Sequence, residues 1–179
     1  NDNLFRINRT TRDNAQDYAR VMVGRGQKRI AIAYDLRNRT FSESWLKEFR
    51  TAAQALNADV VSAVPYESSE STDFDGVVRQ MLALPTDSLF FISGALDVAR
   101  LAQAARKQAP QLPIGASEWA ATEQLIDLGG PVVEGLLIVQ NYDRDDTSTR
   151  FMAFDANGDT VRKVYFTEIR EGRYRRVER

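Results

Sequence analysis

Two repeating patterns of apolar residues alternate along residues 10–140, one with the period of helices and one typical of strands. The run SLFFIS at residues 88–93 is apolar almost without interruption, as in a parallel strand buried on both faces. Trp45, Leu46 and Phe49 instead fall on one face of a helix. We predict strands at 28–34, 58–64, 88–93, 112–116 and 133–140, and helices at 10–23, 42–56, 73–84, 97–109 and 119–128.

Five strands separated by helices predict one fold class. Short connections and right-handed crossovers give a mainly parallel five-stranded sheet covered on both faces, a three-layer α/β/α Rossmann-like lobe. After Asp146 the pattern changes, because Asn157-Gly158 and Glu171-Gly172 are turn signals between short strands. We therefore expect residues 1–146 to form the α/β lobe. Residues 147–179 would be a C-terminal antiparallel β segment packed on it, within one structural domain.

The predicted strand ends suggest a binding site. In open α/β sheets, ligands bind at the carboxyl edge of the strands, near the point where strand order reverses. The loops at this edge supply hydroxyl groups, carboxylates, aromatic rings and a glycine, a mixture that suits a small polar ligand with an apolar part. The candidates are Tyr34, Asp35, Phe41, Tyr66, Ser93, Gly94, Ser117, Glu118 and Trp119. That each residue merely caps or covers its own loop is the alternative interpretation.

Composition narrows the chemistry. The 179 residues are 43% hydrophobic, enough for one complete core. A net charge of −1 argues against general attraction to nucleic acid or membranes, and we interpret the arginine-rich end REGRYRRVER as a surface tail. The chain has no cysteine and no histidine, which excludes disulfides, zinc thiolate sites and Ser-His-Asp catalysis.

Phosphate chemistry is also disfavoured at the first strand end. The following loop, DLRNRTFSES, contains no glycine, so it lacks the bare backbone of a Walker loop or a dinucleotide fingerprint. A phospho-acceptor domain needs clustered carboxylates around Asp35, but the third strand ends in Ser93-Gly94 and the fifth in Gln140-Asn141. We therefore expect no catalytic residue, no cofactor and no metal. A flavodoxin-like enzyme or phospho-acceptor domain remains an alternative.

The order of segments resembles the type I periplasmic solute-binding proteins, especially the branched-chain amino acid and amide receptors of ABC transporters. The resemblance covers nearly the whole chain and rests on five sequence stretches. Each stretch alone is a weak signal for the family, but their order and spacing together are specific. The stretches are LFRINRTTRDNAQDYA, GQKRIAIAYDLRNRTFSESWLKEF, SLFFISGALDVARLAQAARKQAPQLPIGASEWA, EGLLIVQNYD and FDANGDTVRKVYFTEIREGRY.

The resemblance implies one lobe of a two-lobed protein. The chain looks like the carboxy-terminal lobe alone, with two sequence segments joined near residues 147–152 and a first lobe that would precede Asn1. It also adds Ala95 to the candidate residues. Ala95 stands where amino acid binders often place an aromatic residue, and Ser117 where a carboxylate for the ligand ammonium is often found. Glu118 is the neighbour of Ser117, and the departure at Ser117 argues against a free α-amino acid ligand.

The resemblance further implies a non-enzymatic function in the bacterial periplasm. The chain would bind an amino acid or amide-like solute for an ABC transporter, with the missing N-terminal lobe and the membrane subunits as partners. A lone lobe encloses only one side of a ligand, so we expect weak or no binding by this chain alone. An amide- or amino acid-sensing receptor domain is the second alternative. The exposed ligand face would also favour a dimer through Phe41, Tyr66 and Trp119.

Overall fold

One seven-stranded sheet organises the computed structural model, which describes residues 9–141 and 164–177. The strand order is β2-β1-β3-β4-β5-β6-β7. The pairs from β2 to β5 are parallel, and β6 and β7 are added antiparallel beside β5. The strands are β1 (Arg29–Asp35), β2 (Asp59–Tyr66), β3 (Ser88–Ile92), β4 (Ile114–Ala116), β5 (Leu137–Gln140), β6 (Tyr165–Arg170) and β7 (Arg173–Val177). The predicted parallel sheet with an antiparallel extension is confirmed.

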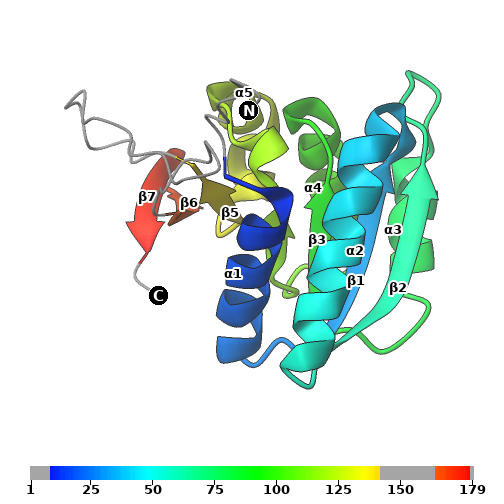
Figure 1. Cartoon of the computed structure of the whole chain (residues 1–179). Helices are drawn as coiled ribbons and strands as arrows, with labels where there is room; N and C mark the ends of the chain where they lie inside the picture. Colours follow the sequence, from blue (N-terminus) through cyan, green and yellow to red (C-terminus); the bar gives the residue numbers. More distant parts are fainter. Residues whose placement is uncertain (1–8, 142–163, 178–179) are drawn as a thin grey trace, which may run out of the picture.

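Helices cover both faces of this sheet (Figure 1). Helices α1 and α2 pack on one face, and α3, α4 and α5 pack on the other. The helices are α1 (Thr11–Gly24), α2 (Arg39–Ala55), α3 (Phe74–Met81), α4 (Ala95–Gln108) and α5 (Glu123–Gly129), with 3-10 turns η1 (Leu36–Asn38), η2 (Glu118–Ala120) and η3 (Gly130–Val133). Because every helix of a parallel unit returns the chain to the next strand, the first turns of these helices lie at the carboxyl edge of the sheet.

The core under α1 and α2 is aromatic. Phe49 stacks on Phe90 with ring centroids 5.2 Å apart, and Trp45 lies 4.9 Å from the same ring. Tyr18 meets Phe90 edge-on at 4.7 Å and donates its hydroxyl hydrogen to the Leu137 carbonyl. All of these side chains are fully buried. The apolar stripe that predicted α2 is therefore the surface that attaches this helix to β3.

Side-chain caps fix two helix starts as the sequence predicts. Thr10 Oγ1 accepts a hydrogen bond of 3.1 Å from the Asp13 backbone N–H, and Asp73 Oδ1 accepts one of 2.8 Å from Gly76. Such caps satisfy backbone donors that have no partner inside the helix.

Other predicted boundaries are wrong. Helix α2 begins at Arg39 rather than Ser42, because Asp35 caps the preceding 3-10 turn and the chain continues directly into the helix. The single helix predicted at 119–128 is a 3-10 turn followed by α5, since Thr122 returns to extended backbone at ψ 160°. Helix α4 starts earlier than predicted, at Ala95, and β5 starts later, at Leu137.

Part of the C-terminal prediction lies outside the described residues. The Asn157-Gly158 hairpin and the domain division at residue 146 both fall there, so they stay predictions. The second predicted turn is observed, because Glu171 and Gly172 join β6 to β7 with positive φ angles. Within residues 9–141 and 164–177, no helix is long and apolar enough to cross a bilayer.

Candidate functional site

The strand order reverses between β1 and β3. The chain leaves β1 for β2 on one side and then enters β3 on the other side of β1. Side chains at the carboxyl ends of β1, β3 and β4 meet near this point. We call Phe41, Gly94, Leu96 and Trp119 together the switch-point surface. These four residues are partly or well exposed, in contrast to most polar side chains near them.

Two aromatic rings form the centre of the switch-point surface. Phe41 and Trp119 meet edge-on, with ring centroids 5.7 Å apart and an interplanar angle of 83°. The indole lies against Gly94, where an added Cβ would be 3.6 Å from the indole nitrogen. The absence of a side chain at Gly94 therefore leaves room for the ring of Trp119. These three predicted residues come from α2, η2 and the start of α4, and the fold brings them together.

Asp35 is an internal cap. Its side chain is 1% exposed, and Oδ1 accepts hydrogen bonds from the backbone N–H groups of Arg37 at 2.9 Å and Ser68 at 3.3 Å. The Arg37 side chain adds a contact of 3.4 Å from Nε to Oδ2. The carboxylate thus holds η1 and the β2–α3 loop at the end of β1. Both carboxylate oxygens of Asp35 therefore accept hydrogen bonds from groups within the protein.

A second internal group involves Tyr66, Ser93 and Asp97. The Tyr66 hydroxyl lies 2.6 Å from Ser93 Oγ and donates to Asp97 Oδ2 at 3.2 Å. All three residues are buried, and burial raises the pKa of the Tyr66 hydroxyl well above its usual value. Tyr66 and Ser93 therefore join β2, β3 and α4 beneath the edge of the sheet.

Glu118 faces the α1 and α2 layer. Its Oε2 accepts a hydrogen bond of 2.9 Å from the Trp45 indole nitrogen, and its Oε1 accepts one of 3.0 Å from Asn14 Nδ2. The same Asn14 nitrogen donates to Asn141 Oδ1 at 3.2 Å, after the end of β5. Burial raises the pKa of the Glu118 carboxyl, and the hydrogen bonds it accepts act in the opposite direction. The two side chains that donate to Glu118, Asn14 and Trp45, are both uncharged.

The remaining predicted residues differ in their surroundings. Ser117 is fully buried, and within the described part of the chain its Oγ has no hydrogen-bond partner. Its backbone N–H donates to the Phe91 carbonyl at 3.0 Å. Ala95 is 7% exposed at the start of α4, and Tyr34 packs half-buried against the α1 and α2 core.

Sequence reasoning missed Asn14 and Trp45 as neighbours of the site. They reach Glu118 from 104 and 73 residues away along the chain. The helix pattern correctly predicts that Trp45 belongs to the apolar stripe of α2. It does not predict that the indole nitrogen of the same side chain donates a hydrogen bond to Glu118. No local spacing signals either contact, because both depend on how α1 and α2 pack beside η2.

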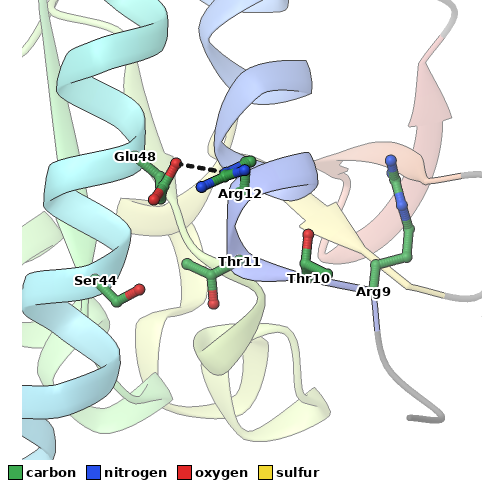
Figure 2. A pocket seen from close by; sticks show the side chains of 6 residues that line it. All are labelled: Arg9, Thr10, Thr11, Arg12, Ser44 and Glu48. Atoms are coloured by element: carbon green, nitrogen blue, oxygen red, sulfur yellow. Dashed lines mark hydrogen bonds and ion pairs between the residues drawn. The ribbon is translucent and has the colours of Figure 1, made fainter. Parts of the chain in front are cut away.

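Among the described residues, surface hollows also lie away from these strand ends. A hollow of about 400 Å³ between the start of α1 and the second and third turns of α2 is drawn in Figure 2, where Arg12 pairs with Glu48 at 3.1 Å. It is lined by Arg9, Thr10, Thr11, Arg12, Ser44 and Glu48. A second hollow of about 230 Å³ lies between α3 and α4. None of the predicted site residues lines either hollow. In the ranges that the structure describes, no group of three or more acidic side chains is arranged to hold a metal ion.

Comparison with solved structures places the fold among ABC transporter binding proteins. A leucine binding protein, LivK, from Thermotoga maritima has a TM-score of 0.89 at 16% identity, with 97% of this chain and 67% of that chain covered. A putative branched-chain amino acid ABC transporter from Rhodospirillum rubrum has a TM-score of 0.83 at 17% identity, with the same two coverages. A solute binding protein from R. palustris in complex with benzoate has a TM-score of 0.82 at 14% identity, covering 98% of this chain and 64% of that chain.

These similarities extend over nearly all of this chain but over only part of each relative. The chain spans about two thirds of the similar structures. No curated protein sequence matches it. A sequence profile described as periplasmic binding protein matches residues 1–168, nearly the full chain. The expected family is therefore confirmed, and this chain belongs to the periplasmic binding protein family.

Proposed function

We propose that this chain is a solute-binding lobe that captures a small molecule for an ABC transporter. The observation that carries the proposal is the Phe41–Trp119 pair, whose indole lies against Gly94, at the reversal of strand order. Two partly exposed aromatic rings next to a glycine give a small apolar surface at the edge where α/β sheets bind ligands. Nothing in this arrangement supplies an activated nucleophile, since Asp35 and Glu118 are occupied as hydrogen-bond acceptors within the fold.

The ligand-contacting residues in this proposal are fewer than the sequence suggests. Phe41, Gly94 and Trp119 would touch the solute directly, and Leu96, which is 42% exposed two residues after Gly94, would extend this surface along α4. Asp35, Tyr66 and Ser93 would support the surface from below through their internal hydrogen bonds. Ala95 and Ser117 are buried, Tyr34 packs against the α1 and α2 core, and Glu118 faces the same layer, so these four residues would support the contact residues from within the fold.

A second lobe, the periplasm and the membrane subunits of a transporter belong to the same proposal. The similar structures are described as ABC transporter proteins, and each is longer than the portion this chain covers. Solutes bound by such proteins are enclosed between two bodies that close about a hinge. On this proposal a second lobe would cover the switch-point surface and raise affinity by enclosing the solute. A dimer through the same surface would rest on Phe41 and Trp119, since Tyr66 is only 6% exposed.

The proposal is tested by following solutes with NMR on the isotope-labelled chain. A panel of branched-chain amino acids, their amides, aromatic acids and sugars would be titrated to millimolar concentrations, because one lobe alone binds weakly. We expect at least one class to shift Phe41, Gly94 and Trp119 signals together. Trp119→Ala should weaken that binding about tenfold, as for the loss of a central aromatic contact.

The control for this test is Leu84→Ala. Leu84 is 53% exposed beyond the end of α3, so Leu84→Ala removes an exposed apolar side chain away from the switch-point surface. It should leave solute binding unchanged. Shifts that are spread over the whole surface, or that Trp119→Ala leaves intact, would refute the proposed site.

A further inference from the structure

The backbone pairing between β4 and β5 stops short of the switch-point surface. Its last pair is Ala116 with Ile138, after which η2 begins at Glu118 while β5 continues to Gln140. The turn that carries Trp119 is therefore not held to β5 by the hydrogen bonds of a strand ladder. Side-chain contacts are left to set how this turn lies against the end of β5.

One side-chain amide bridges this gap. Asn14 is fully buried in the first turn of α1, where its backbone N–H donates to the Thr10 carbonyl at 3.2 Å. Its Nδ2 donates to Glu118 Oε1 at 3.0 Å and to Asn141 Oδ1 at 3.2 Å. An amide nitrogen carries two hydrogens, so each bond can use one. Helix α1, η2 and the residue that follows β5 thus meet at a single group.

The carboxylate of Glu118 decides which way the Asn14 amide faces. An ionised carboxylate only accepts hydrogen bonds, so the amide nitrogen and not the oxygen must lie toward it. The other amide atom, Asn14 Oδ1, is buried and has no hydrogen-bond partner among the described residues. A buried acceptor without a partner costs stability. This cost indicates that the contribution of Asn14 lies in the two bonds that its nitrogen makes.

These bonds act on the residue next to the aromatic pair. Glu118 is followed directly by Trp119, whose indole lies against Gly94 and meets Phe41 edge-on with ring centroids 5.7 Å apart. Glu118 Oε2 accepts from Trp45 on α2, and Oε1 is the oxygen that joins the same turn to α1. Because its two oxygens are bonded to different helices, the carboxylate restricts rotation of η2.

We infer that Asn14 is a positioning residue for the switch-point surface. Its side-chain amide holds η2 against the end of β5 and thereby fixes Trp119 beside Phe41 and Gly94. Asn14 acts through Glu118 and is itself fully buried, so it does not touch a solute. The inference rests on the solute-binding function proposed above for the purpose of this surface, and its test needs no solute.

Exchanging the two polar partners tests this role. Asn14→Asp removes the donor and sets a second carboxylate against Glu118, across a contact that is now a 3.0 Å hydrogen bond, and like charges this close repel. Adding Glu118→Gln places the amide at position 118 and the carboxylate at position 14. A hydrogen bond then runs in the opposite direction, while the amide oxygen at position 118 still accepts from Trp45. Asn141 can turn its own amide nitrogen toward the new carboxylate.

The position of Trp119 is the measured quantity. NMR on the isotope-labelled 179-residue chain detects it through nuclear Overhauser contacts of the indole with Gly94 and Phe41. At neutral pH we expect Asn14→Asp to lose these contacts and the exchanged double variant to regain them. Asn14→Ala removes both hydrogen bonds without adding charge and should also lose the indole contacts, so it serves if Asn14→Asp does not fold.

Val21→Ala is the control for a loss of stability alone. Val21 is half-buried on the same helix and packs against the α1 and α2 core, but it lies two turns beyond Asn14. We expect this variant to unfold at a lower urea concentration than the parent chain. It should keep the contacts of Trp119 with Gly94 and Phe41, because η2 retains its bond to Asn14.

Each outcome bears on the inference separately from the proposed function. If folded Asn14→Asp and Asn14→Ala both keep the indole contacts, Asn14 serves stability alone and the inference is overturned. It is also overturned if the exchanged double variant folds without regaining the contacts. If the contacts respond as expected and no compound of the solute panel binds, the positioning role of Asn14 stands and the proposed function fails.

Discussion

The indole nitrogen of Trp45 donates a hydrogen bond of 2.9 Å to Glu118 Oε2, joining the middle of α2 to the turn that follows β4. Trp45 also packs on Phe49 and Phe90, so one side chain belongs both to the aromatic core and to the edge of the sheet. Glu118 is thereby fixed next to Trp119, the ring that forms the centre of the switch-point surface. The position of that ring therefore depends on packing between α2 and β3.

Trp45→Phe tests this link. The ring remains largely in place, but Oε2 of Glu118 loses its donor in a half-buried position. We expect a loss of about 1–3 kcal/mol in the free energy of unfolding, the usual cost of leaving a buried polar group unsatisfied. Urea unfolding followed by circular dichroism measures this loss, because the signal does not depend on tryptophan fluorescence.

A double-mutant cycle separates the hydrogen bond from the change in ring size. Glu118→Ala and the double variant complete the cycle, and we expect a coupling energy of at least about 0.5 kcal/mol for residues in direct contact. Additive effects of the two substitutions would mean that the Trp45–Glu118 bond contributes nothing to stability.

Stability should also depend on pH through Glu118. Burial raises the pKa of this carboxyl in the folded chain above its usual value of 4.5. Between the two values the folded chain keeps a proton that the unfolded chain has lost, so the free energy of unfolding falls as the pH rises through this window. Glu118→Gln removes the titration. The stability of the parent chain relative to this variant should therefore decline as the pH rises above about 4.5.

Other acids titrate with the opposite sign and cancel in that comparison. Hydrogen bonds from Arg29 lower the pKa of Asp87, and bonds from Arg170 and Arg25 outweigh desolvation to lower that of Glu168. Both carboxylates support the fold at neutral pH and lose that contribution on acidification. They are present in both proteins, so the difference in unfolding free energy isolates Glu118. A difference that stays constant from pH 3 to pH 7 would contradict the prediction.

The fold could be predicted because its signals are local. Apolar runs such as residues 88–93 identified buried parallel strands, and the stripe through Trp45 and Phe49 identified the face of α2. Asp73 identified a helix start because its cap lies within one turn. The antiparallel extension was indicated by the turn at Glu171-Gly172, where Gly172 has a positive φ angle that glycine adopts readily.

The roles of the site residues could not be predicted in the same way. The sequence brought Asp35 and Glu118 to one edge of the sheet but carried no sign of which way each carboxylate points. Glu118 turns toward Trp45 and Asn14, and Asp35 turns toward the β2–α3 loop through Ser68. These directions are set by partners far away in the chain. Composition at a strand end therefore identifies a candidate edge, and tertiary packing decides which side chains remain available to a ligand.

Gly115→Ala should destabilise the sheet. A Cβ at this position of β4 would overlap the Tyr18 hydroxyl and press on the Phe90 ring at 3.1 Å. Both neighbours are fully buried and Tyr18 is held by its bond to Leu137, so neither moves without loss of packing. We expect a loss of about 1–3 kcal/mol in unfolding free energy, as for an overpacked core. Thermal or urea unfolding checks this value.

Gly24→Ala is the matched substitution at the end of α1. No atom lies within 4 Å of an added Cβ there, and the residue is helical. Replacing a helical glycine by alanine without steric conflict stabilises by about 0.5–1 kcal/mol. Opposite signs for the two variants would confirm that contact with Tyr18 determines the effect at Gly115. If Gly115→Ala left the unfolding free energy unchanged, the side chains packed around Tyr18 would have moved to accommodate the methyl group at no cost in stability.

Tyr66→Phe decides whether the Tyr66 hydroxyl serves the fold or the ligand. The substitution removes its contacts with Ser93 and Asp97 while the ring keeps its edge-on contact with Phe74. We expect a loss of about 1–2 kcal/mol in unfolding free energy because the remaining groups are buried. Tyr174→Phe, which removes an exposed hydroxyl bonded to the Thr122 carbonyl, should cost less since water replaces that bond.

Solute affinity gives the second measurement for Tyr66. Because the side chain is only 6% exposed and lies under the edge of the sheet, the affinity of folded Tyr66→Phe for a solute should match that of the parent chain. Ser93 and Asp97 remain within 3.5 Å of each other, so the start of α4 keeps one of its internal contacts and Gly94 keeps its place against Trp119. A large loss of affinity without loss of stability would instead place the Tyr66 hydroxyl on the ligand and extend the binding surface toward β2.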